Sequence, residues 1–203
     1  MDVHKTNAAF YNRNARGWSE FHTSSFHHEP QFRRFIRYFQ TGDTILDIGC
    51  ANGIHVPLFL GIGRHLRYTG MDISRALVTI ARTHYPQVSF QVANIADRRT
   101  LPRRKFDGFW AAAVLMHVPE AEWPVTFGNI ERLIRRGGVG YLTLPRRRPN
   151  PPSRRDRRHF TLMPTAGILR CFRGRGWQVL VRGVLHGTTI ASNWRWFIVR
   201  LPK

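Results

Sequence analysis

Apolar residues recur at helical spacing through the first forty positions of the chain. Tyr11, Ala15 and Trp18 share one face of a first predicted helix. Residues 32–39, "FRRFIRYF", carry apolar side chains at i, i+3, i+4 and i+7, which is typical of a helix that packs on a core. A glycine shortly afterwards ends this second helix. Residues 1–42 are therefore predicted to form an N-terminal helical cap.

From residue 44 the pattern changes to short apolar runs separated by helical stretches. Strands are predicted over residues 44–48, 66–72, 88–93, 106–115 and 139–144. The longest intervening helix is expected over residues 120–136, ended by Gly137 and Gly138. Strands that alternate with helices are typical of βαβ units, and right-handed crossovers then produce a parallel sheet covered on both faces.

The last third of the chain has a different order. A helix over residues 164–177 precedes two strands, 178–186 and 194–201, which are joined by the polar segment 187–193. This pattern predicts an antiparallel hairpin at one edge of the sheet. The fold class is therefore α/β: a doubly wound, mostly parallel seven-stranded sheet of Rossmann-like type, with a C-terminal antiparallel hairpin and an N-terminal helical cap.

One domain is expected over residues 1–203, because this length buries a single core. Its parts are the helical cap, the core of alternating strands and helices, an arginine-rich loop and the C-terminal helix with its hairpin, at residues 1–42, 43–145, 146–160 and 161–203. The loop contains "RRRPNPPSRRDRR", which has no aliphatic residue to pack. It is either a solvated connection or a lid that binds an anion, since loops after parallel strands surround ligands in such folds.

The net charge of +20 has two interpretations. Such a charge favours a polyanionic partner. However, 29 of the 32 basic residues are arginine, as a GC-rich coding sequence produces without any such partner. Nucleic-acid binding therefore stays an alternative.

Two cysteines, Cys50 and Cys171, are too few for a disulfide framework or a metal cluster, and no metal site is predicted. No apolar run is long enough to span a bilayer, and no secretory signal is visible. We expect both thiols to be reduced, and the protein to be soluble and cytoplasmic.

The stretch "TILDIGCANG" at residues 44–53 ends the first strand in small residues. A dinucleotide fingerprint requires G-x-G-x-x-G, and the order Gly49-Cys50-Ala51-Asn52-Gly53 lacks the third glycine. A P-loop is excluded as well, because neither Lys-Ser nor Lys-Thr follows. The remaining arrangement of strand, tight turn and helix N-terminus suits a ligand with a carboxylate and an adenosine.

Two carboxylates flank this turn in the predicted sheet. Asp47 precedes it and can accept bonds from backbone amides or from a ligand ammonium. Asp72 ends the second strand about 20 residues later, where an acid can bind two ribose hydroxyls. A ribose-binding acid without a pyrophosphate turn indicates an adenosyl cofactor that has no phosphate, and S-adenosylmethionine is the natural candidate.

Four segments together resemble class I S-adenosylmethionine-dependent methyltransferases of the small type 11 kind. "ILDIGCANG" is similar to LDxGCGxG with Ala51 for the middle glycine, and "YTGMDIS" is similar to GxDxS. "FDGFWAAAVLMHVP" is similar to FDxVxxxxxLxHxP, and "IERLIRRGGVGYLTLP" to LxRxLxPGGxLxxxxP with Arg136 for the proline. Each motif alone is weak, but four in order with matching spacing are specific. The resemblance runs from about Tyr11 to the C-terminus.

This resemblance implies S-adenosylmethionine as cofactor, with contacts at Tyr11, Asp47, Gly49, Cys50, Ala51, Gly53, Asp72, Ile73, Asn94, Ile95 and Ala111. Asn94 stands where the family has an acid for the adenine amino group, and an amide oxygen can still accept that bond. Asp97 is the alternative for that contact. Ala111 would offer backbone to the methionine end, and Tyr11 stands where relatives place an aromatic over the cofactor.

Methyl transfer from a sulfonium is an in-line displacement with an activated leaving group, so the enzyme mainly positions the acceptor. A base is needed only where the acceptor must lose a proton. His117, a few residues after the fourth strand, is the candidate base, with a scaffold role as the alternative. His55 is interpreted as a packing or polar contact.

The predicted function is methyl transfer to a small-molecule acceptor at O, N, C or S. Arg157 and Arg158 of the arginine-rich loop are predicted to bind a carboxylate or phosphate on that acceptor. Two alternatives are a methyltransferase acting on tRNA, rRNA or DNA bases and a cofactor-binding partner protein without transferase activity.

Overall fold

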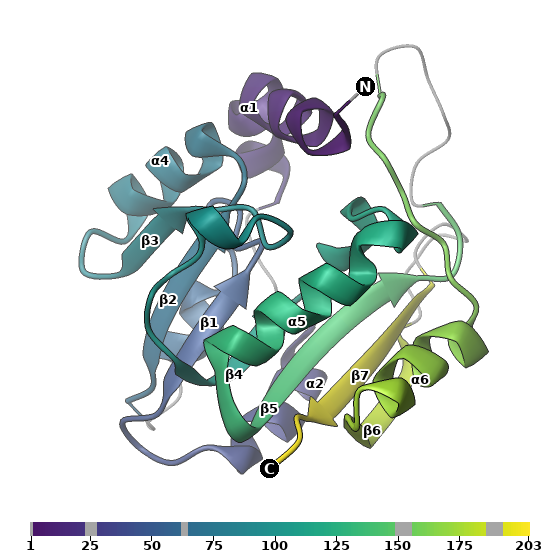
Figure 1. The fold of residues 1–203 in the computed structure, drawn as a ribbon. Helices are drawn as coiled ribbons and strands as arrows, with labels where there is room; N and C mark the ends of the chain where they lie inside the picture. Colours follow the sequence, from purple (N-terminus) through teal and green to yellow (C-terminus); the bar gives the residue numbers. More distant parts are fainter. Residues whose placement is uncertain (1, 23–27, 62–64, 149–155, 186–192) are drawn as a thin grey trace.

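The computed structural model describes residues 2–22, 28–61, 65–148, 156–185 and 193–203. Within these residues, seven strands form one sheet in the order β3-β2-β1-β4-β5-β7-β6, with helices on both faces (Figure 1). The strands are β1 (Thr44–Ile48), β2 (Arg67–Asp72), β3 (Ser89–Val92), β4 (Phe106–Ala111), β5 (Ile134–Pro145), β6 (Gln178–Leu185) and β7 (Trp194–Arg200). The longer helices are α1 (Val3–Phe21), α2 (Glu29–Phe35), α3 (Val56–Leu60), α4 (Arg75–His84), α5 (Trp123–Leu133) and α6 (Thr165–Gly174).

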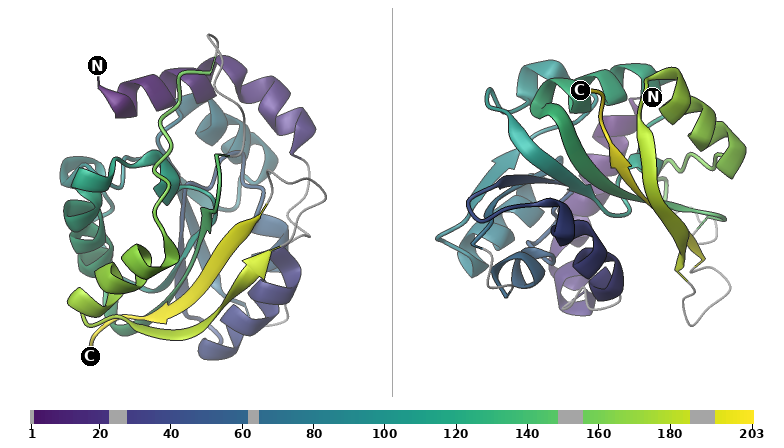
Figure 2. Two further views of the ribbon diagram at one scale, coloured as in Figure 1. Left: turned by 90° about the vertical axis from the view of Figure 1, so that its right-hand side faces the viewer. Right: turned by 90° about the horizontal axis from the view of Figure 1, so that it is seen from below.

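Strands β1 to β5 run parallel, and β7 lies antiparallel between β5 and β6 (Figure 2). The predicted fold class is thus confirmed, including the C-terminal antiparallel pair. The polar connection expected at 187–193 falls almost entirely outside the described residues.

Each face of the sheet has its own core. One contains Phe109 of β4 with Phe127 and Phe172 from α5 and α6. The opposite core contains residues of α2, α3 and α4, and in it Trp110 stacks on Tyr141 with ring centroids 3.8 Å apart. Because both faces are covered, the central strands read as almost continuous apolar runs.

The two helices predicted as one cap have different positions. Helix α1 lies across the carboxyl edge of the sheet and packs on α4 (Figure 1). Helix α2 instead packs on a face of the sheet, where Phe32 and Phe35 are buried beside Trp110. Only α1 therefore covers the carboxyl ends of the strands.

Two predicted boundaries are wrong. Strand β4 ends at Ala111 rather than near residue 115, and α5 ends at Leu133, with β5 beginning at once. Gly137 and Gly138 therefore lie inside β5 rather than ending the helix. A Cβ on Gly138 would stand 2.7 Å from the carbonyl oxygen of Asp107, so glycine permits the close approach of β4 to β5.

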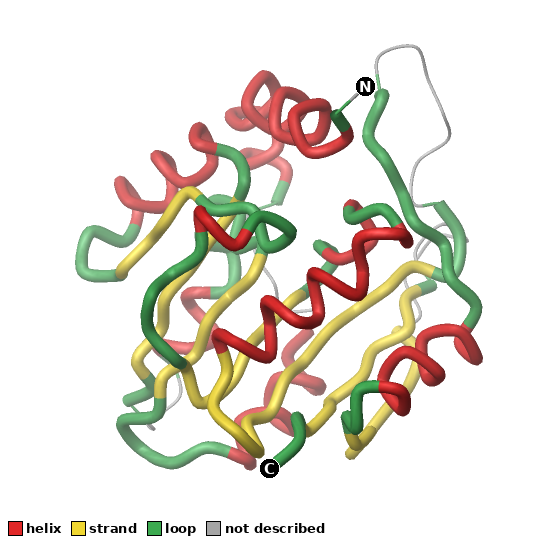
Figure 3. The backbone as a smooth tube through the Cα atoms, in the orientation of Figure 1, coloured by secondary structure: helices red, strands yellow, loops and turns green. Residues whose placement is uncertain are grey.

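The segment from 156 to 164 has neither helix nor strand and descends from the carboxyl edge to α6 (Figure 3). Residues 149–155 of the predicted arginine-rich loop lie outside the described part. No helix within the described ranges is both long and apolar enough to cross a bilayer.

Candidate active site

A cavity of about 930 Å³ lies at the carboxyl edge of the sheet, beneath α1. Seven of the predicted cofactor residues line it: Tyr11, Gly49, Ala51, Asp72, Ile73, Asn94 and Ile95. Four others lie behind its wall: Asp47, Cys50, Gly53 and Ala111. The sequence motifs therefore converge on one cavity, but they contribute to it in two different ways.

The turn after β1 has a backbone that favours glycine. Gly49, Ala51 and Gly53 have φ angles of 77°, 49° and 82°. A Cβ on Gly49 would stand 2.6 Å from the side chain of Val114, which follows β4. The backbone of Gly49 donates to the carbonyl of Met71 across 2.7 Å, so the turn is fastened to β2. This close packing leaves bare backbone on the cavity side.

Asp72 ends β2 on the wall of the cavity and is 9% exposed. Its Oδ2 accepts from the amide of Ala51 (3.0 Å) and its Oδ1 from the amide of Ser74 (2.8 Å). Burial raises the pKa of this carboxyl to about 6. The amide of Ile73 also bonds this carboxyl, and the remaining acceptor capacity of the carboxylate is available to hydroxyl groups of a ligand in the cavity.

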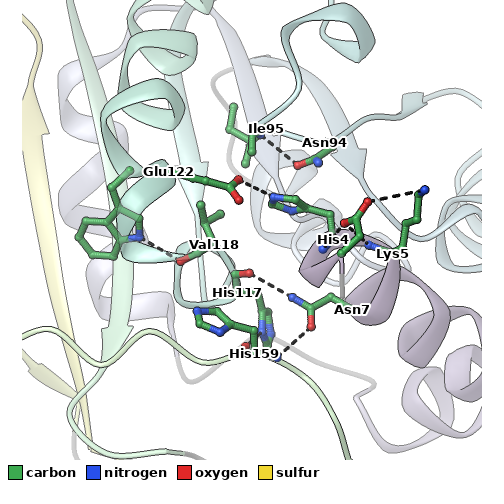
Figure 4. A network of polar contacts seen from close by, with 12 residues as sticks. His4, Lys5, Asn7, Asn94, Ile95, His117, Val118, Glu122 and His159 are labelled. Carbon is green, nitrogen blue, oxygen red and sulfur yellow. Dashed lines mark hydrogen bonds and ion pairs between the residues drawn. The ribbon is translucent and has the colours of Figure 1, made fainter.

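Asn94 follows β3 at the opposite end of this wall, beside Ile95. Its Oδ1 accepts from the amide of Ala96 across 3.0 Å, which stabilises its own turn (Figure 4). The alternative residue, Asp97, does not line the cavity and pairs with Arg99. Asn94 is thus the one of the two that faces the cavity.

Asp47 is fully buried and reaches the cavity only through His55. Its Oδ2 accepts from Nδ1 of His55 (2.9 Å) and from the hydroxyl of Tyr68 (2.6 Å). Because the carboxylate accepts from Nδ1, the second ring nitrogen of His55 is the lone-pair atom of the neutral ring. That Nε2 has no hydrogen-bond partner within the described residues, and His55 lines the cavity.

The other three residues behind the wall support the turn by packing. Cys50 is fully buried and faces Gly70, and Gly53 lies close to the ring of Tyr85. Ala111 is the last, fully buried residue of β4. The next residues, Ala112 to Val114, line the cavity in its place.

Helix α1 forms the roof of the cavity and is held by hydrogen bonds near its start and at its middle. Near its start, His4 Nε2 lies 2.6 Å from Glu122 Oε2. Asn7 donates to the carbonyl of His117 and accepts from the amide of His159, both at 3.0 Å (Figure 4). Further along, Asn12 Oδ1 accepts from the hydroxyl of Ser74 across 2.8 Å.

His117 lines the cavity, but both of its ring nitrogens are engaged. Nδ1 lies 2.8 Å from the carbonyl oxygen of His159 and must donate to it, so Nε2 accepts from the hydroxyl of Tyr11 across 2.9 Å. Burial lowers the pKa of His117 to about 4, and the nearby Arg158 acts in the same direction. A neutral, engaged imidazole suits a positioning role better than proton abstraction.

Arg158 also lines the cavity, with its guanidinium already engaged. It pairs with Asp156 at 2.8 Å, donates to the Tyr11 hydroxyl at 2.9 Å and lies 4.2 Å from the ring centroid of Phe10. Arg157 is exposed and borders a separate depression along α1. The two predicted anion-binding arginines are therefore not brought together in the cavity.

The sequence interpretation missed the polar stripe on the underside of α1. His4, Asn7, Tyr11 and Asn14 are spaced three or four residues apart and all line the cavity. This spacing was readable as one helix face. Among the described residues, no group of three or more His, Cys, Asp or Glu side chains has an arrangement that could hold a metal ion.

Comparison with known proteins gives a consistent result. Residues 45–138 match a family model described as a methyltransferase domain. The magnesium protoporphyrin IX methyltransferase of Synechocystis PCC 6803, solved with bound S-adenosylmethionine, has a TM-score of 0.75 to this chain and 17% identity. The match covers 99% of this chain and 98% of that one, and at this identity it shows the fold.

Two curated relatives are similar over part of their length. The tRNA (carboxymethyluridine(34)-5-O)-methyltransferase ALKBH8 of Mus musculus is 35% identical over 126 residues, which are 60% of this chain and 18% of that protein. The trans-aconitate 2-methyltransferase of Azoarcus sp. (strain BH72) is 29% identical over 111 residues, 55% of this chain and 42% of that protein. The chain thus spans less than half the length of these relatives.

The fold is similar to that of solved methyltransferases. Residues 45–138, less than half of the chain, match a methyltransferase domain, and the fold is similar to that of a methyltransferase solved with bound S-adenosylmethionine. The residues present fit that cofactor, because a bare turn, a carboxylate with remaining acceptor capacity and an amide follow one another along the cavity wall.

Proposed function

We propose that the chain transfers a methyl group from S-adenosylmethionine to a small-molecule acceptor. The observation that supports this most is the position of Asp72 opposite the glycine turn, with Ala51 joined to it by a hydrogen bond of 3.0 Å. Carboxylate and turn belong to neighbouring parallel strands and share one cavity wall. We assign the ribose hydroxyls to Asp72 and the amino-acid end to the turn, with Asn94 beside the adenine.

We assign a second polar contact at the amino-acid end to His55. Asp47 holds its Nδ1, so Nε2 presents a lone pair to the cavity two residues after Gly53. A lone pair suits the α-ammonium group of the cofactor. In this assignment Asp47 acts as a positioning residue, since the carboxylate fixes the ring but does not itself reach the cavity.

When bound, the cofactor supplies an electrophilic methyl on a sulfonium. The chain has to hold the acceptor in line and exclude water, and such positioning supplies on the order of 7–11 kcal/mol. The roof of α1, closed by Arg158 over Phe10, serves this purpose.

We do not propose that His117 removes the proton from a hydroxyl or ammonium acceptor. Both of its nitrogens are engaged, and its pKa of about 4 makes it a weak base. We assign it the positioning of the Tyr11 hydroxyl, whose own pKa is raised by burial. Tyr11 thus lies where α1, Arg158 and His117 meet over the cavity.

An anionic acceptor is one form of this proposal, since one relative is named for a carboxylate, trans-aconitate. In this chain Arg158 pairs with Asp156, so an anion would have to replace that carboxylate. Arg157 has no such pairing with Asp156 and is exposed to solvent beside α1. If it guides an anion to the cavity, Arg157→Ala will raise KM for a carboxylate acceptor without changing cofactor affinity.

A second candidate acceptor is an RNA base. It is favoured by the similarity to a tRNA methyltransferase and by the net charge of +20. Labelled methyl transfer from S-adenosylmethionine into total tRNA, compared with transfer into a small-molecule extract, distinguishes the two acceptors.

Calorimetry with S-adenosylhomocysteine tests the cofactor part of the proposal. Binding with one site per chain is expected, and its absence in folded protein would refute the assignment of the cavity. Binding without methyl transfer to either acceptor pool would instead support the cofactor-binding partner protein without transferase activity.

A further inference from the structure

Basic side chains line the edge of the sheet that faces away from the cavity. The parallel strands begin at this edge, and β7 ends there beside the C-terminus (Figures 1 and 2). Arg67 begins β2, and the segment "RRK" leads into β4. We define the basic band as Arg67, Arg103, Arg104, Lys105, Arg135, Arg136, Arg200 and Lys203.

Contacts between strands join these side chains into one surface. Arg67 is paired in register with Thr44, whose hydroxyl lies 3.4 Å from Arg135 Nη1. Arg104 donates to the hydroxyl of Thr69 on β2, and Arg136 donates to the backbone oxygen of Lys203. The band therefore crosses β2, β4, β5 and β7 without leaving the edge.

This surface keeps a large excess of positive charge. Every member of the band is exposed except Arg200, which is partly buried. Among the described residues, the acidic side chains that these contacts bring to the edge are Asp43 and Asp107, and Asp107 is already paired with Arg135 at 2.5 Å. Eight basic side chains thus face two acids. Arg158 at the cavity pairs with Asp156, whereas most side chains of the band form no ion pair with an acidic side chain within the described residues.

One aromatic side chain accompanies the band. Tyr38 is 37% exposed, and the guanidinium of Arg200 lies 5.8 Å from its ring centroid. Exposed aromatic rings and arginine planes are the groups on which unpaired bases stack.

We propose that the basic band binds the phosphate backbone of RNA. Guanidinium groups match phosphate oxygens in two-pronged geometry, and the charge excess supplies the attraction to a polyanion. The band lies at the opposite edge from the cavity, so this binding function is separate from methyl transfer. It holds whichever acceptor the cavity takes, and it goes beyond the proposed function.

The test is fluorescence anisotropy of a labelled RNA of about 20 nucleotides, titrated with protein between about 50 and 300 mM KCl. Arg103→Gln with Lys105→Gln removes two band charges. The matched control, Arg75→Gln with Arg98→Gln, removes two exposed charges at the carboxyl edge, near the ends of β2 and β3. Both double variants have the same net charge.

We expect the band variant to bind RNA about tenfold more weakly, with a log–log salt slope reduced by about 1.4, since each lost contact with single-stranded RNA removes about 0.7. The control variant should stay within about twofold of the unchanged protein, because its charges lie outside the band. Unchanged thermal unfolding of both variants shows that they are folded.

Three outcomes would overturn the proposal. The first is absence of RNA binding by the unchanged protein at the lowest salt. The second is an equal loss of affinity in both double variants, which would mean that net charge alone attracts RNA. The third is binding of anionic vesicles of phosphatidylserine and phosphatidylcholine without binding of RNA. None of these readouts depends on methyl transfer.

Discussion

The hydroxyl of Tyr11 donates to Nε2 of His117 across 2.9 Å, and thereby joins the roof of the cavity to the segment after β4. The direction of the bond follows from the other ring nitrogen, which must donate to the carbonyl of His159. Arg158 donates to the same hydroxyl from the opposite side. One phenol thus connects α1, the segment after β4 and the segment after β5.

Replacing Tyr11 with Phe tests this connection. The substitution leaves Nε2 of His117 buried without a donor, and an unsatisfied buried polar group costs about 1–3 kcal/mol. We expect the free energy of unfolding in urea to fall by about that amount. Tyr38→Phe is the control, because its ring is 37% exposed and the change should stay within about 0.5 kcal/mol. Equal effects of the two substitutions would contradict the assigned role of Tyr11.

If Asp72 binds the ribose as proposed, cofactor affinity depends on pH. Burial raises the pKa of this carboxyl to about 6, and in the proposed assignment the ionised carboxylate is the form that accepts from two ribose hydroxyls. Affinity should therefore be full well above pH 6 and decrease as the pH falls through 6. At about one unit below the pKa the dissociation constant of S-adenosylhomocysteine should be about tenfold higher.

The Asp72→Asn variant supplies the control for this pH dependence. Loss of charge-assisted bonds should weaken S-adenosylhomocysteine binding at neutral pH by about 2 kcal/mol. Between pH 5 and pH 7.5 its affinity should be nearly constant. A variant that keeps the pH dependence would show that another group titrates.

His55 can be tested with a pair of ligands that differ at the amino-acid end. We expect His55→Phe to weaken the binding of S-adenosylhomocysteine by about 1–2 kcal/mol, which is the effect of losing one hydrogen bond to a charged group. Affinity for 5′-methylthioadenosine, which lacks the ammonium and carboxylate, should be unchanged. Calorimetry of both ligands measures this. If both affinities fall equally, His55 supports the fold of the cavity rather than the cofactor tail.

Gly49 should not tolerate a side chain. Its φ of 77° is unfavourable for other residues by about 1–2 kcal/mol, and a Cβ would stand 2.6 Å from Val114. We expect Gly49→Ala to lower both the unfolding temperature and the affinity for S-adenosylhomocysteine. Gly17→Ala is the matched control: it lies within α1 with no atom within 4 Å of the new methyl, and it should stabilise the helix by up to about 1 kcal/mol.

The sequence by itself determined the fold class and seven of the residues that line the cavity. Alternating apolar runs and helical stretches are local patterns in the sequence. A small or acidic residue directly after an apolar run marks the position where that strand ends. Asp72 and the turn at Gly49 were therefore found from spacing alone, since parallel strands bring their carboxyl ends to one edge. The end of α5 was predicted wrongly because Gly138 was interpreted as a helix stop. In the structure Gly138 lies within β5, where the absence of a side chain lets β4 approach closely.

Tertiary structure alone decided what each polar side chain does. Arg158 and Asp156 are two residues apart, yet the pairing that engages Arg158 is completed by Tyr11, far away in the sequence. The fold buries Asp47 behind His55 and joins the two by a hydrogen bond, and distant groups engage both ring nitrogens of His117. Hydrogen-bond partners and burial come from segments that only folding brings together, so no local pattern specifies them.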